Sequence, residues 1–128
     1  MVKNNITEEM NNESIHFIKK LDSLGLSPEA AFWFYDVEKN SWKFIVAEKN
    51  LKKEGPKFVY KKIKNLLLNS PNEFPNISLS DIVLLDEKDP LITLLRSAIR
   101  TGKGITSIRF SHNVINGTLI DDAVIYRL

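Results

Sequence analysis

The residues best suited to chemistry lie near the C-terminus, where a histidine and an aspartate face each other across a predicted hairpin. Asn116-Gly117 stands between two stretches of alternating hydrophobicity and predicts a type I′ turn, because that turn needs positive φ at both central positions. This register places His112 opposite Asp121. A histidine whose tautomer is set by a carboxylate can act as a general base. With Arg109 and Arg100 nearby, the set has the composition of a phosphodiester-cleaving site.

Two features of the same hairpin weaken this catalytic interpretation. Successive residues of a strand point to opposite faces, so Arg109 is expected on the face opposite His112. His112 shares its face with Phe110 and Ile108, which instead predicts a histidine at the edge of the core, hydrogen-bonded to Asp121. We therefore keep His112 and Asp121 as candidate catalytic residues but favour the structural interpretation.

Basic side chains form the second candidate site. Residues 48–64 carry seven Lys against two Glu, and residues 96–109 carry three Arg and one Lys. Such side chains could follow a phosphate backbone with sequence-independent, salt-sensitive affinity, and Phe58 and Tyr60 lie among them. No RNP motif, helix-turn-helix or zinc finger accompanies them, so a solvated helix face is the favoured interpretation. The candidate anion-binding residues are Lys57, Lys61, Lys64, Arg96, Arg100 and Arg109.

Aromatic side chains form the third candidate site. A hairpin that pairs Val37 with Trp42 places Tyr35 opposite Phe44, on the same face as Trp42. If that face were exposed, Tyr35, Trp42 and Phe44 would form a partner-binding patch. The alternative is that these side chains pack in the core.

Several other chemistries are excluded or disfavoured. The chain has no Cys and only two His, so we expect no disulfide, no thiolate nucleophile, no metal site and no cofactor. Gly102-Lys103-Gly104 is not expected to be a phosphate-binding loop, because it follows a predicted helix instead of preceding one. Asp121 and Asp122 are neighbours on a strand and cannot act jointly.

The elements that position these residues follow from hydrophobic periodicity and from capping residues. Asp89-Pro90 predicts a helix start, Gly102 predicts its end, and residues 50–55 are expected to form a charged loop. Helices are predicted over Thr7–Leu24, Pro56–Leu68 and Pro90–Thr101, and strands over Ala30–Val37, Trp42–Ala47, Ile77–Leu85, Ile105–Asn113 and Leu119–Leu128.

The order αββαβαββ predicts an α+β fold in which helices pack on a mixed five-stranded sheet that contains two hairpins. The length of 128 residues is that of a single domain, and residues 1–5 are expected to be frayed. No apolar stretch is long enough to span a membrane, and no secretory signal is apparent. We expect a cytoplasmic protein.

Several short segments, together with the strand over residues 42–47, resemble small bacterial proteins of uncharacterised function. The resemblance rests on residues 89–92, 98–102, 108–111, 116–117 and 126–128. It implies a bacterial cytoplasmic protein and assigns no activity or catalytic residue.

The favoured hypothesis is a non-catalytic interaction or regulatory domain that binds a protein partner or a second copy of itself. The alternative is a nucleic-acid-binding protein or small RNase that combines the basic surface with His112. The two hypotheses differ in one geometric requirement. The alternative needs Arg96 and Arg100 to share a surface with the lysines of residues 57–64.

Overall fold

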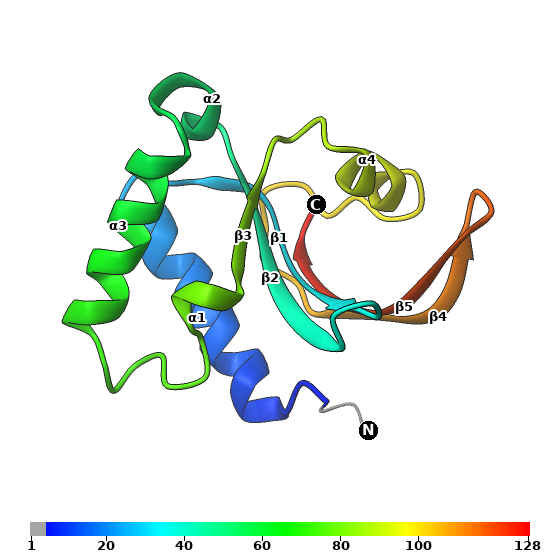
Figure 1. Cartoon of the computed structure of the whole chain (residues 1–128), viewed down its shortest axis with the longest axis horizontal. Coiled ribbons are helices and arrows are strands. Elements are labelled where there is room, and N and C mark those ends of the chain that lie inside the picture. The colour runs from blue at the N-terminus through cyan, green and yellow to red at the C-terminus, as the bar shows by residue number, and fades with distance from the viewer. Residues whose placement is uncertain (1–4) are drawn as a thin grey trace.

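The computed structural model of the chain describes residues 5–128, and it confirms the predicted α+β fold (Figure 1). The predicted frayed segment therefore lies outside the described residues except for Asn5. The elements in chain order are α1 (Glu8–Ser23), β1 (Pro28–Asp36), β2 (Ser41–Glu48), α2 (Asn50–Glu54), α3 (Pro56–Asn69), the 3-10 helix η1 (Leu79–Asp81), β3 (Ile82–Leu85), α4 (Pro90–Arg96), β4 (Ile108–Ile115) and β5 (Thr118–Arg127).

The five strands form one mixed sheet in the order β3-β2-β1-β5-β4. The β1–β2 and β4–β5 pairs are the two predicted hairpins, β1 and β5 pair antiparallel, and β2 and β3 pair parallel. The chain returns from β2 to β3 through α2 and α3, as a parallel pair requires a crossover. The first hairpin and the last one thereby meet in the middle of the sheet, with β1 at its centre.

Hydrophobic cores lie on both faces of the sheet, as the apolar residues on both faces of β1 and β2 predict. On one face, α1 and α3 cover the strands (Figure 1). This core includes Phe17 of α1 and Ile63 of α3, which pack with Trp33 of β1. On the other face, Ile92 and Leu95 anchor the short helix α4. The two groups of helices therefore lie on opposite sides of the sheet.

The first hairpin has a different register from the predicted one. Tyr35 pairs with Trp42 and Trp33 with Phe44, so the predicted pairing of Val37 with Trp42 is wrong by two residues. The turn begins one residue earlier because Asn40 has a φ of 51° and supplies the left-handed position. A shift of two residues leaves every side chain on its predicted face.

Three element boundaries also differ from the prediction. Residues 50–54 form α2, where a loop was predicted, because Leu51 packs against the core. The strand predicted over residues 77–85 begins only at Ile82, since the backbone before it turns through η1. The strand predicted from Ile105 begins at Ile108, although the amide of Thr106 still donates to the carbonyl of Tyr126 at 2.8 Å.

Helix α4 ends at Arg96, five residues before the predicted end at Thr101. Thr101 is instead bound to the end of the chain. Its amide donates to the carbonyl of Leu128 at 3.0 Å, and its side-chain oxygen accepts a hydrogen bond from the Leu128 amide at 2.9 Å. These tertiary hydrogen bonds take the place of the last helical turn.

Candidate functional site

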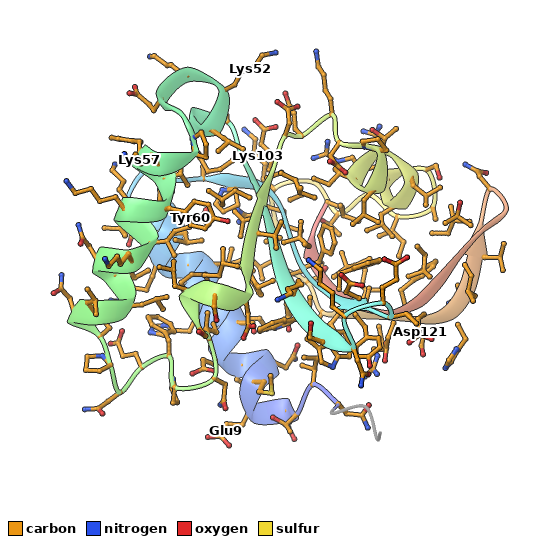
Figure 2. All side chains as sticks on the ribbon, viewed as in Figure 1. Glu9, Lys52, Lys57, Tyr60, Lys103 and Asp121 are labelled. Carbon is orange, nitrogen blue, oxygen red and sulfur yellow. The ribbon has the colours of Figure 1, made fainter. Side chains whose placement is uncertain are left out.

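A groove between α3 and η1 brings together three of the predicted binding residues; Figure 2 labels Lys57 and Tyr60 of its lining on α3. Lys57, Lys61 and Lys64 are spaced so that they lie on one stripe of the helix, and all three are exposed. Val59 and Ile63 occupy the opposite stripe and are fully buried, so core packing sets the direction of the lysines. The groove has a volume of about 1020 Å³ and is lined by Lys57, Phe58, Tyr60, Lys61, Lys64, Leu79 and Ser80.

The floor of this α3 groove is apolar and comes from two elements. Tyr60 is half-buried, and its hydroxyl donates to the carbonyl of Ile82 at 3.0 Å, which ties α3 to the edge strand β3. Leu79 of η1 lies beside it. Phe58 is 38% exposed, and the Nζ of Lys62 lies 5.0 Å from the centre of its ring. Lysines thus surround a surface on which apolar groups remain accessible.

Arg96 and Arg100 do not belong to this groove. Arg96 ends α4, which packs on the face of the sheet opposite α3, and Arg100 lies in the segment that follows α4. The guanidinium of Arg96 donates to the backbone carbonyl of Glu29 at 3.0 Å. The surface shared by arginines and lysines, which the nucleic-acid hypothesis requires, is therefore not formed.

Arg109 lies with the aromatic set, on the α1 side of the sheet. Its Nε and Nη2 donate to the two carboxylate oxygens of Asp122, both at 2.5 Å, and its guanidinium carbon lies 6.0 Å from the ring centre of Trp42. The side chain of Asp122 is 1% exposed and that of Arg109 is 45% exposed, so the ion pair joins a buried carboxylate to a partly exposed guanidinium. The hydrogen bond with Asp122 raises the pKa of Arg109, which keeps the guanidinium charged.

The aromatic side chains are packed instead of forming an open patch. Phe44 is fully buried, Tyr35 is buried, and the rings of Tyr35 and Trp42 meet edge to face with centres 5.4 Å apart. The hydroxyl of Tyr35 is also hydrogen-bonded to the side chain of Asn40. Phe44 belongs to the core on the α1 side and Trp42 packs partly buried against it, so the three side chains do not form the exposed face that partner binding was expected to need.

His112 and Asp121 are neighbours, as the hairpin register predicts, with Nδ1 and Oδ1 3.8 Å apart. The side chain of His112 is 71% exposed, so its predicted place at the core edge is wrong. The reason lies in the backbone, since His112 has a φ of 49° and interrupts the regular alternation of β4. Arg109 pairs with Asp122 on the opposite face, so the groups needed for phosphodiester cleavage do not converge.

Other structural findings bear on the kind of site. Within residues 5–128, no three His, Cys, Asp or Glu side chains are grouped so that they could hold a metal ion. No helix among these residues is both long and apolar enough to cross a membrane. His16 is exposed and stacks on Phe74 with ring centres 5.4 Å apart.

Comparison with protein-family models found no matching family, and comparisons with curated proteins and with solved structures found no significant match. The geometry of the chain therefore carries the functional argument. The part of the α3 groove that the sequence did not indicate is Leu79 and Ser80, which lie some fifteen residues beyond Lys64 in the chain. Only the parallel docking of β3 beside β2 brings them to α3.

Proposed function

We propose that this chain is a non-catalytic interaction domain whose α3 groove binds an acidic, partly apolar segment of a protein partner. The observation that carries the proposal is the combination in one groove of a lysine stripe with accessible apolar side chains. Carboxylates of the partner would pair with Lys57, Lys61 and Lys64. Apolar side chains of the partner would cover Phe58 and Leu79, and the release of water from these surfaces favours association.

The same groove supports a protein partner better than a nucleic acid. Single-stranded nucleic acids bind to exposed aromatic faces on which bases stack, together with a charged track. In the groove only Phe58 offers an exposed ring, because Tyr60 is half-buried and its hydroxyl is already engaged. Because Arg96 and Arg100 are separated from the lysines, the row of cations that could contact a phosphate backbone is also shorter.

The cellular setting forms part of this proposal. The resemblance noted for the sequence and the absence of cysteine from all 128 residues support a bacterial cytoplasm. A second copy of the chain would also be a protein partner, and its Asp86, Glu87 and Asp89 would supply suitable carboxylates.

Binding of defined probes tests the proposal. Fluorescence anisotropy would compare three labelled probes: an amphipathic peptide of Glu, Asp and Leu, the same peptide with every Leu changed to Ser, and oligouridine of similar charge. We expect the amphipathic peptide to bind best. The variant Phe58→Ser should weaken this peptide several-fold, because its apolar side chains lose their main contact. Light scattering over a range of protein concentrations would show whether a second copy fills the groove.

A matched pair of charge variants supplies the control. Lys57→Gln, Lys61→Gln and Lys64→Gln together should weaken the peptide roughly tenfold, since exposed ion pairs contribute about 0.2–1 kcal/mol each. Lys19→Gln, Lys39→Gln and Lys88→Gln change the net charge equally at exposed positions on other elements and should have little effect. Preference for oligouridine, or equal losses in both triple variants, would refute the proposal.

A further inference from the structure

A second cavity lies where the end of α1, the start of β1 and the end of β5 meet, away from the α3 groove. It has a volume of about 640 Å³, which is within the range of small-molecule sites of about 300–1,000 Å³. We call it the β5-end cavity. Its walls come from six separate parts of the chain and include Asp22, Pro28, Glu29, Lys49, Arg96, Arg100, Lys103, Arg127 and Leu128. Lys103, labelled in Figure 2, lies in the loop between α4 and β4.

The charge of the β5-end cavity is strongly unbalanced. Five cationic side chains line it against two acidic side chains, although the whole chain has a formal charge of +2. Lys49, Arg100 and Lys103 are exposed at its mouth and free to reorient toward a ligand in solution. A hydrogen bond with the carboxyl of Glu87 raises the pKa of Glu29, and burial adds to the effect.

Two of the arginines are held in place by the fold. Arg127 is 6% exposed, and its guanidinium donates to both oxygens of Asp22 at 3.0 and 2.9 Å and to the carbonyl of Pro28 at 3.0 Å. Arg96 is fixed by its hydrogen bond to the carbonyl of Glu29. Because these guanidinium groups are already ordered, a ligand would bind them with a smaller loss of conformational entropy.

Arg127 also retains unused hydrogen-bonding capacity. Its Nε–H is buried and has no acceptor within residues 5–128. A buried donor without an acceptor costs free energy, and most such groups in proteins are satisfied by protein atoms or by ordered water. A bridging water molecule held by an oxygen-rich ligand in the cavity would supply an acceptor, after a small shift of the buried guanidinium.

We propose that the β5-end cavity binds a small multivalent oxyanion, that is, a small molecule bearing phosphate or several carboxylate groups. Arginine is suited to both groups, because its planar fork donates two parallel hydrogen bonds to either one. Arg96 and Arg127 form the fixed wall of the site, and Arg100, Lys103 and Lys49 close over the ligand. The site is independent of the α3 groove, since the two share no residue.

Calorimetry with pyrophosphate and with citrate tests this proposal on the whole chain at physiological salt. We expect at least one of the two anions to bind with a one-to-one stoichiometry, and the tighter one identifies the group that the cavity prefers. The double variant Arg100→Gln, Lys103→Gln should weaken binding at least tenfold, because each charge-assisted hydrogen bond to an anion is strong. Backbone amide NMR shifts should localise the ligand at residues 100–103.

The matched control is Lys57→Gln, Lys61→Gln, which changes the net charge equally in the α3 groove and should alter the affinity by less than about twofold. Lys49→Gln, on the segment after β2, should also weaken binding of the anion. It provides the test if the double variant proves unfolded. Absence of binding by both anions would overturn the proposal, and so would equal losses in the double variant and its control. The outcome of these anion-binding experiments does not depend on whether the α3 groove binds the peptide, because the two sites share no residue.

Discussion

Tyr126 is expected to make the stability of this protein fall at alkaline pH. Its side chain is fully buried against Phe44, with ring centres 6.3 Å apart, and its hydroxyl makes no hydrogen bond of normal geometry within residues 5–128. Burial raises the pKa of Tyr126 to about 12. Ser14 already donates its own hydrogen to the carbonyl of Met10 at 2.7 Å, so it cannot also donate to a phenolate.

The sign and size of the effect follow from the two pKa values. A tyrosine in the unfolded chain has a pKa of about 10, so between pH 10 and pH 12 the unfolded state loses the proton first. Losing the proton stabilises the unfolded state relative to the folded state, so stability falls as pH rises. Two pKa units correspond to about 2.7 kcal/mol over the whole window, and about half of this is lost by pH 11.

Urea unfolding of the natural chain and of Tyr126→Phe at pH 8 and pH 11 measures this effect. At pH 8 the two proteins should have unfolding free energies within about 1 kcal/mol, because the substitution removes a hydroxyl without a partner. At pH 11 the natural chain should have lost about 1.4 kcal/mol more than the variant, and all other titrating groups cancel in the difference. The reasoning is refuted if the difference between the two proteins is the same at both pH values.

Three further predictions concern stability. Arg109→Met should lower the unfolding free energy in urea by about 3 kcal/mol, because it removes the guanidinium partner of the buried Asp122 carboxylate. Adding Asp122→Leu should restore most of this loss, and an equal loss in the single and the double variant would contradict the prediction. Glu87→Gln should lower the pKa of Glu29 in an NMR titration and flatten the fall in stability with pH above the usual pKa of 4.5, whereas an unchanged pKa would contradict the shared hydrogen bond. Gly117→Ala should lower the unfolding free energy by about 1 kcal/mol, since Gly117 has a φ of 81° and an added Cβ meets nothing within 4 Å; no loss would mean that the turn changes type.

Local signals in the sequence predicted the elements whose cause is also local. The turn at Asn116-Gly117 is confirmed, with φ values of 47° and 81°, because few other residues tolerate positive φ. The start of α4 is confirmed as well, since the Asp89 side chain accepts a hydrogen bond from the amide of Leu91 at 2.9 Å. Helices α1 and α3 carry their core contacts in their own periodicity, so their positions are confirmed too.

The predictions that failed depended on distant partners or on single residues with positive φ. The end of α4 is decided by Thr101 and Leu128, which lie far apart in the chain. The exposure of His112 is decided by a positive φ that no residue around it signals. The end of α4 cannot be inferred from propensity, because it is set where two distant segments meet.

The candidate sites show the same division. By itself, the sequence determined the α+β class, the last hairpin and the lysine stripe over residues 57–64, because each depends on side-chain spacing along one continuous segment. Only the tertiary structure decided that Arg96 and Arg100 are separated from those lysines. It also decided that the two arginines share a single cavity with Lys49 and Arg127. The physical reason is the order of the strands, since pairing β1 with β5 in the middle of the sheet fixes which distant segments become neighbours.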